Sequence, residues 1–338
     1  MIIPNARVIV NSNSPKIKHK RLFFEPIKLG NFVFFSILKD ETNHRKSKMK
    51  ISGFTFIRNG TLLGYPFIES ILSALPICDE FIVAVGDSED DTLARIQAIG
   101  SDKIRIIQTQ WNEKMQDRGF VYAQQKMIAQ YNCTGDWAFY LEGDEVLHED
   151  DLPKIKASME KHLNNPEVEA LAFDYHHFFG SPDWVAISPA WYRQECRIIR
   201  NTIRSWAPDG LYFVVMDKNK KGRYPKAALV GVPIYHYGHV RSVEAMRQKN
   251  ERVGKYWKHD HPLFNGYKID PQALKSFNGD HPSIVTDWLK NGAEKRFSPD
   301  KNHQLTRREK KHRWAMKLEH IFNCDLSKNH FKLVNIKK

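Results

Sequence analysis

The sequence predicts an α/β fold in which helices flank a mostly parallel β-sheet. From residue 51 onwards, apolar runs of strand length alternate with stretches of helical periodicity, a pattern typical of parallel sheets with helices on both faces. The expected strands cover residues 51–57, 80–85, 104–109, 137–141 and 168–173. The expected helices cover residues 65–75, 92–99, 120–131 and 152–163.

Length and composition indicate a globular chain with charged ends. With 338 residues and 41% hydrophobic content, it can bury the core of one large domain or two smaller ones. The net charge of +13 is concentrated at the ends, because residues 1–50 and 301–338 each hold 11 Lys/Arg against 3 Asp/Glu. The near-neutral centre does not indicate a nucleic-acid-binding protein. Basic ends suit an anionic lipid surface or another polyanion, although solvated charge is the more common origin of such runs.

Three regions are expected along the chain. Residues 1–48 are basic and irregular, and we expect either a poorly ordered leader or a segment that precedes a natural start at Met49. A globular domain is expected over 49–250 and a helical extension over 251–338. Within the extension, residues 305–322 predict a basic amphipathic helix. Such a helix most often packs its apolar stripe on the body, and docking on a membrane surface is the alternative.

Cysteine spacing and hydropathy bear on the compartment. The four cysteines lie far apart and form no C-x-x-C pair, so neither a zinc site nor a compact disulfide framework is indicated. No run approaches the roughly 18 to 20 apolar residues that span a bilayer, and the first residues lack a secretory pattern. The sequence therefore predicts a cytoplasmic protein, with peripheral attachment to the inner face of the membrane as the alternative to a freely soluble one.

Three carboxylates follow the apolar run of residues 137–141. Glu142, Asp144 and Glu145 lie where an open α/β sheet binds its ligands, at the carboxyl end of a strand. Without a partner they would repel one another, so the pattern favours a hard divalent cation such as Mg²⁺ or Mn²⁺. A plain acidic turn at the start of a helix is the alternative.

Four ordered stretches carry a resemblance to a known family. They are Phe56–Asn59, residues 79–92, residues 135–145 with the Leu-Glu-Gly-Asp-Glu sequence, and residues 235–244 with the Tyr-His-Tyr-Gly sequence. In this order and spacing they resemble family 2 glycosyltransferases of the GT-A fold. Within that family the chain most resembles enzymes of bacterial lipopolysaccharide core and other surface-glycan pathways.

The resemblance implies a set of ligands and site residues. It implies a nucleotide-diphosphate sugar donor, a saccharide or glycolipid acceptor, a divalent metal and inverting transfer. The donor-binding residues would be Phe56, Arg58, Asn59, Asp87, Lys126 and Glu142. The metal ligands would be Asp144, Glu142 and His236, and the catalytic residues would be Asp209 and Glu145, with Asp174 as an alternative base.

The chain departs from the family pattern at two positions. Glu142 replaces the first Asp of the metal-binding Asp-x-Asp motif, and the carboxylate that usually reads the base falls on Val85 or Gly86, which leaves Asp87 as the nearest acid. Other interpretations stay open: His236 as a packed core residue, and Asp209 as part of a turn. A catalytically silent module of the same fold, docked on a membrane or polyanion, is the alternative function.

Overall fold

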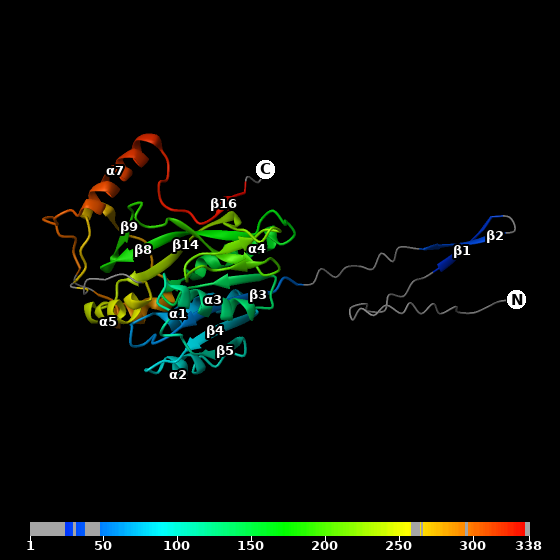
Figure 1. The fold of residues 1–338 in the computed structure, drawn as a ribbon, viewed down its shortest axis with the longest axis horizontal. Coiled ribbons are helices and arrows are strands. Elements are labelled where there is room, and N and C mark those ends of the chain that lie inside the picture. Colours follow the sequence, from blue (N-terminus) through cyan, green and yellow to red (C-terminus); the bar gives the residue numbers. More distant parts are fainter. Residues whose placement is uncertain are drawn as a thin grey trace. The chain divides into compact units, whose positions relative to one another are not determined.

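The computed structural model describes residues 24–29, 32–37, 48–257, 264, 266–294 and 297–334. It divides into two compact units, Met1–Lys48 and Met49–Lys338. The first unit contains an antiparallel pair of strands, β1 (Phe24–Leu29) and β2 (Phe32–Ile37). The second unit holds the large sheet and every helix of the described residues (Figure 1).

Four parallel strands form one half of the large sheet, in the order β5-β4-β3-β6. They are β3 (Ile51–Ile57), β4 (Glu80–Gly86), β5 (Ile104–Thr109) and β6 (Trp137–Tyr140). The helices between and after them are α1 (Phe67–Ala74), α2 (Thr92–Gln97), α3 (Phe120–Tyr131) and α4 (Leu152–His162). The structure thus confirms the predicted α/β fold.

The second half of the sheet adds antiparallel pairings beyond β6. Strand β10 (Gln194–Arg200) pairs antiparallel with both β6 and β8 (Ala170–Phe179), and the long strand β14 (Lys226–His239) runs parallel to β8. The shorter strands of this half are β7 (Glu145–Val146), β9 (Ser181–Ala186), β15 (Leu274–Ser276) and β16 (Lys332–Leu333). A separate small sheet consists of β11 (Ser205–Trp206), β12 (Val214–Met216) and β13 (Gly222–Arg223).

The remaining helices lie in the C-terminal third. They are α5 (Val243–Gly254), α6 (Thr286–Asn291) and α7 (Arg307–Phe322), with 3₁₀ turns at Leu75–Ile77, Glu149–Asp151, Lys255–Trp257, Pro271–Ala273 and Ser283–Val285. The domain boundary expected at residue 250 falls inside α5. Helix α7 is the expected basic helix, and a capping box between Thr306 and Glu309 fixes its start. No helix in the described part of the chain is long and apolar enough to cross a membrane.

Alternating side chains of the central strands fill two cores, one on each face of the sheet. On β4, Phe81, Val83 and Val85 belong to one core, and Ile82 and Ala84 belong to the other. Helices α1, α2 and α4 contribute to the first core and α3 to the second. Because both of their faces are covered, β4 and β6 are nearly continuous apolar runs without polar alternation.

Strand register brings the acidic loop after β6 beside β14. The short strand β7 pairs with β14 so that Glu145 lies opposite His236, and the Tyr237 amide donates to the Asp144 carbonyl at 2.8 Å. A shift of one residue would turn His236 to the other face of the sheet. The main-chain ladder therefore determines which side chain of β14 meets the carboxylates.

Candidate functional site

A cavity of about 580 Å³ opens at the carboxyl ends of β3 and β6. This volume lies within the range of small-molecule sites, and the position is the one at which open α/β sheets bind ligands. The wall comes from the end of β3, the loop after β6, the end of β14, and the segment from α5 to Trp257. Among the predicted site residues, Phe56, Arg58, Asn59, Glu142, Asp144 and His236 line it.

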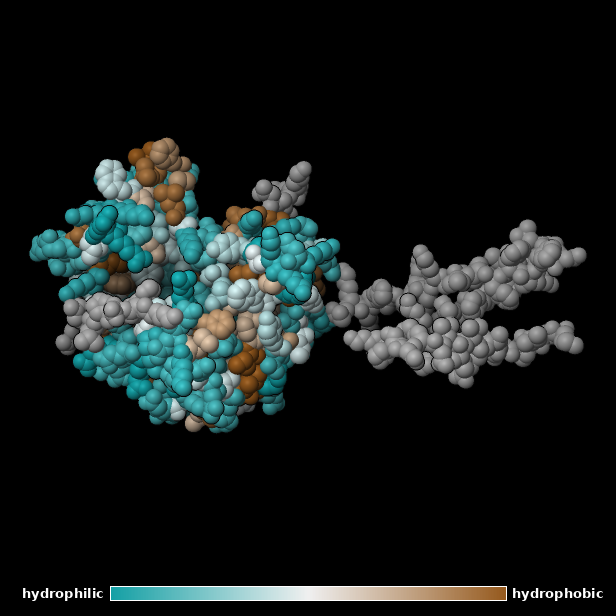
Figure 2. Space-filling model, in the orientation of Figure 1, coloured by the Kyte–Doolittle hydropathy of each residue, from teal (hydrophilic) through white to brown (hydrophobic). Residues whose placement is uncertain are grey.

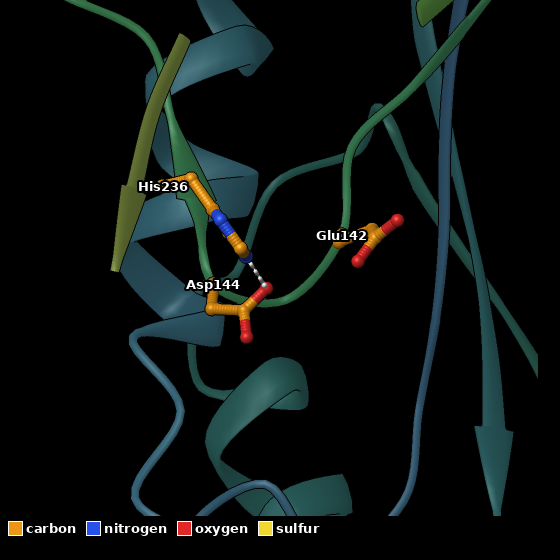
Figure 3. A group of neighbouring side chains, drawn as sticks. All are labelled: Glu142, Asp144 and His236. Carbon is orange, nitrogen blue, oxygen red and sulfur yellow. Dashed lines mark ion pairs between the residues drawn. The ribbon is translucent and has the colours of Figure 1, made fainter. Parts of the chain in front are cut away.

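Glu142, Asp144 and His236 form the polar centre of this wall. Their potential ligand atoms all lie within 4.8 Å of one another, and His236 Nε2 is 3.5 Å from Asp144 Oδ1 (Figure 3). The imidazole projects from β14, whereas both carboxylates come from the loop after β6. Two carboxylates and one imidazole make a donor set that suits a divalent cation, and the set by itself does not select Mn²⁺ over Mg²⁺.

A chain of hydrogen bonds determines which nitrogen of His236 has a free lone pair. The Tyr192 carbonyl can only accept, so His177 donates from Nε2 to it at 2.7 Å. Burial holds the pKa of His177 well below its ordinary value, and neighbouring His236 acts in the same direction, so the His177 ring is neutral. Its Nδ1 then accepts from His236 Nδ1 at 2.7 Å. In neutral His236 the lone pair is therefore on Nε2, the atom that faces Asp144, as a metal ligand requires.

Asp144 is ionised and held by two cations. Arg241 donates to Asp144 Oδ2, and Lys249 Nζ lies 3.9 Å from the same oxygen. Burial acts to raise the pKa of Asp144, but the positive charge of His236 in its protonated form, together with Arg241 and Lys249, holds it well below its ordinary value. Arg241 is completely buried, and its guanidinium carbon lies 3.7 Å from the Tyr65 ring centroid. These contacts leave Oδ1 of Asp144 directed at His236.

Glu142 differs from Asp144 in its protonation. Its side chain is 27% exposed, and Oε1 accepts from Arg197 Nη2 at 3.0 Å. Burial raises the pKa of Glu142 to about 7, and the negative charge of Glu145 acts in the same direction, whereas Arg197 opposes both. Glu142 therefore exchanges its proton near neutral pH, where a bound cation would favour the ionised form.

Glu145, predicted as a catalytic residue, lies beneath the cavity and does not line it. Its completely buried carboxylate accepts from Arg197 Nε at 2.8 Å and Arg197 Nη2 at 2.7 Å, and from the Tyr175 hydroxyl at 2.9 Å. It also accepts from the Glu142 amide at 3.1 Å. Because these bonds occupy both oxygens, Glu145 holds the loop in place and has no face toward a ligand in the cavity.

Lys126, Asp209 and Asp87 also lie outside the cavity lining. The buried Lys126 ammonium donates to the carbonyls of Gly210 and Leu211, both at 3.2 Å, and thereby supports two residues that do line the cavity. Asp209 Oδ1 accepts from the Leu211 amide at 2.8 Å, as in the turn considered from the sequence. The exposed Asp87 contributes its main-chain carbonyl, which accepts from Arg58 Nε at 2.7 Å.

Aromatic residues that sequence analysis did not identify form the opposite wall. Trp111 and Tyr122 pack against Phe56 with ring centroids 6.2 and 5.8 Å away. Within the described part of the chain, the buried Trp111 Nε1 and Tyr122 hydroxyl have no hydrogen-bond partner. Trp111 also takes the space beside Gly86, since a Cβ there would lie 2.4 Å from its Nε1. The indole therefore occupies the place where the family's base-reading carboxylate is expected. Trp111 follows β5 in an irregular segment, and no sequence pattern marks it.

Comparisons with known proteins give only distant likenesses. No family model matches the chain, and no curated protein matches it. Among solved structures, S. aureus TarS is 13% identical over 64% of this chain and 41% of its own, with a TM-score of 0.34. The Mycobacterium tuberculosis glucosyl-3-phosphoglycerate synthase in complex with Mn²⁺, UDP-glucose and phosphoglyceric acid is 14% identical. The match covers 69% of this chain and 88% of the synthase chain, with a TM-score of 0.35. The Pyrobaculum calidifontis mannosyltransferase PcManGT in complex with GDP-Man and Mn²⁺ is 17% identical. The match covers 38% of this chain and 36% of the mannosyltransferase chain, with a TM-score of 0.29. The chain thus spans less than half of the TarS chain, and likenesses this distant do not establish what it binds or does.

Protonation of Glu142 predicts a pH dependence of metal binding. Below a pKa of about 7 the carboxyl holds its proton, so protons compete with the cation, and above it they do not. We expect Mn²⁺ to bind about tenfold more tightly at pH 8 than at pH 6, measured by titration calorimetry, because one proton is displaced. Glu142→Gln removes this group, so its weaker binding should vary less with pH. An identical pH profile in wild type and variant would contradict the assignment.

Removal of the His177 hydrogen bond should weaken metal binding without disrupting the core. In His177→Phe a ring still stacks on Tyr175, but nothing accepts from His236 Nδ1. Loss of such an outer partner typically costs about 10- to 100-fold in metal affinity, and we expect this for Mn²⁺, measured from free-ion electron paramagnetic resonance. The adjacent His176→Phe is the control, because the His176 ring packs on Tyr235 and is not among the residues that could hold the metal, which are Glu142, Asp144 and His236. Equal affinity in both variants would show that the hydrogen bond does not orient His236.

Proposed function

We propose that this chain is a metal-assisted glycosyltransferase that uses a nucleotide-diphosphate sugar. The observation that carries the proposal is the convergence of Glu142, Asp144 and His236 at one end of a cavity whose other wall is aromatic. One end suits a cation with a diphosphate, and the other suits the flat face of a nucleobase. The acceptor proposed from the family resemblance is a saccharide or glycolipid of a bacterial surface glycan.

The charged residues of the cavity suit a diphosphate leaving group. Glu142, Asp144 and His236 would hold a divalent cation, which offsets the negative charge that develops on the departing diphosphate. Lys249 also lines the cavity. Burial lowers its pKa to about 8, and Arg241 acts in the same direction while Asp144 opposes it. Lys249 therefore remains mostly cationic at pH 7 and can bind a phosphate oxygen.

The aromatic wall is proposed as the nucleobase site. Phe56 and Trp111 both line the cavity and offer aromatic surface on which a nucleobase could stack, whereas the Trp111 Nε1 is buried beside Gly86 and is not open to a ligand. Arg58 and Asn59 line the same end. Arg58 is paired with Glu113, and its guanidinium carbon lies 5.5 Å from the Trp111 ring centroid. In this proposal stacking replaces the carboxylate contact that Asp87 was expected to make.

In the proposed transfer, an acceptor hydroxyl attacks the anomeric carbon, the bond to the diphosphate oxygen breaks, and the hydroxyl proton leaves. Neither predicted catalytic residue, Asp209 or Glu145, lines the cavity, so no residue is assigned to take this proton. Inversion at the anomeric carbon stays a prediction from the family resemblance. Nuclear magnetic resonance of the product's anomeric proton tests it, and a product with the donor's configuration would refute it.

A catalytically silent nucleotide-sugar-binding module is the second candidate. It is favoured by the pairing of the other carboxylates in the described cavity wall, since Glu89 binds Arg252, and Glu113 binds Arg58 and Lys255. Apart from Glu142 and Asp144, each carboxylate in the described cavity lining is therefore paired with a cation and is not free to act as a general base. Metal-dependent release of nucleoside diphosphate from a bound donor would establish the enzyme. Tight donor binding without release, in the presence of candidate acceptors, would establish the module.

Donor binding is the first test. A thermal-shift panel of UDP-, GDP- and other nucleotide sugars with Mn²⁺ should raise the melting temperature for one nucleotide class, because a ligand that binds only the native state stabilises it. Asp144→Asn should abolish the Mn²⁺-dependent part of the shift. The matched control is Asp150→Asn, whose carboxylate is 87% exposed and lies outside the cavity lining. No shift with any donor would reject both candidates for the nucleotides in the panel.

Trp111 should determine nucleotide affinity. Trp111→Ala removes the stacking surface, and we expect about tenfold weaker binding of the nucleotide alone, measured by titration calorimetry. Trp111→Phe keeps an aromatic face and should retain most of the affinity while it loses the indole N–H. The affinity for Mn²⁺ in the absence of nucleotide should not change in either variant. Unchanged nucleotide affinity in Trp111→Ala would place the base elsewhere.

A further inference from the structure

Helix α7 is attached to the body through its polar face. Arg313 donates to Asp270 from Nε and Nη2 at 2.6 and 2.7 Å, and Glu319 accepts from Arg193 at 2.7 and 2.8 Å. Glu309 accepts from the Asp270 amide at 2.9 Å. These three helix residues are half-buried and lie on one side of the helix. Ion pairs and hydrogen bonds therefore hold α7 in place.

The opposite face of α7 is apolar and exposed. Trp314, Leu318, Ile321 and Phe322 are 66%, 41%, 69% and 69% exposed, and no residue of the helix is buried. Their spacing of four, seven and eight residues after Trp314 aligns them in one stripe. Figure 2 shows the corresponding brown patch on α7. An amphipathic helix normally buries such a stripe against another surface. Among the described residues, no surface covers this one, and an exposed apolar patch of this kind indicates an interaction site.

Cations surround the apolar stripe. The helix holds six Lys/Arg and two Glu, and both Glu make the body contacts described above. The exposed cations are Arg307, Arg308, Lys310, Lys311 and Lys317. The outward side of α7 is consequently basic as well as apolar. Docking of a second copy through the same stripe would bring like charges together, which opposes self-association.

We infer that α7 is a membrane-docking helix that lies in the headgroup region of an anionic bilayer. Trp, Leu, Ile and Phe on one side with Lys and Arg around them are the composition of helices that insert only their apolar face into the acyl boundary. Exposed cations add attraction to anionic headgroups and make binding dependent on salt. The inference rests on α7 alone and holds whether or not the cavity binds a nucleotide sugar.

The native cysteines allow a direct test. Cys324 is exposed two residues after the end of α7, whereas Cys78, Cys133 and Cys196 are buried, so an environment-sensitive fluorophore can be attached to Cys324 of the full chain. We expect a blue shift and co-flotation with vesicles of phosphatidylcholine and phosphatidylglycerol at 3:1, and much weaker binding to phosphatidylcholine alone. High salt should weaken the binding to anionic vesicles.

Two variants separate the apolar and electrostatic contributions. Ile321→Ser/Phe322→Ser changes only exposed side chains and should weaken vesicle binding about tenfold or more. Lys310→Glu/Lys311→Glu should remove the preference for anionic lipid. The matched control is Leu229→Ser/Leu333→Ser, which replaces exposed apolar residues on β14 and β16 and should bind like wild type. Equal melting temperatures of the variants and wild type confirm that the fold is intact.

Four results would overturn the inference. They are no binding to either vesicle, equal binding by wild type and Ile321→Ser/Phe322→Ser, binding without a blue shift at Cys324, and lipid-free self-association in sedimentation that this variant abolishes. The last would assign the stripe to a second copy. Because the vesicles contain no nucleotide, failure of the transferase proposal leaves these outcomes unchanged.

Discussion

The cavity depends on the buried ion pairs between the acidic loop after β6 and two arginines far away in the sequence. Arg197 on β10 binds both Glu145 and Glu142, and Arg241 after β14 binds Asp144. Buried carboxylates without partners are strongly destabilising, by about 3 to 5 kcal/mol when one partner of a buried pair is removed. The loop can therefore take this conformation only when β10 and β14 are in place, which couples formation of the site to completion of the sheet.

The same interactions give three neighbouring carboxylates three different properties. Glu145 is saturated by Arg197 and Tyr175 and supports the loop, whereas Asp144 stays ionised because cations surround it. Burial raises the pKa of Glu142 to about 7, and its anionic neighbours Glu145 and Asp144 act in the same direction while Arg197 opposes them. Environment rather than residue type thus determines which of these acids is structural and which can exchange a proton for a cation.

Helix α7 shows the same dependence on context. Its amphipathic pattern is evident in the sequence, but its ion pairs with Asp270 and Arg193 hold one polar side against the body and leave the apolar stripe and the flanking cations exposed. The cavity and α7 thus present two chemically different surfaces, a recess lined by Glu142, Asp144 and His236, and an exposed helix face that is apolar and basic.

The sequence alone determined the α/β fold and the region of the site, because strand periodicity and strand-end carboxylates are local patterns. The sequence also pointed to Glu142, Asp144 and His236 as metal ligands. In the structure the potential ligand atoms of these three residues lie within 4.8 Å of one another. The tertiary structure decided which predicted residues face the cavity. Glu145 and Lys126 are buried against distant segments and do not face the cavity, and Trp111 and Tyr122 form a wall, because these orientations depend on contacts between distant segments. Asp209 closes a local turn outside the cavity lining. For α7, periodicity shows that one side is apolar, but only the ion-pair partners on the body decide which side faces outward.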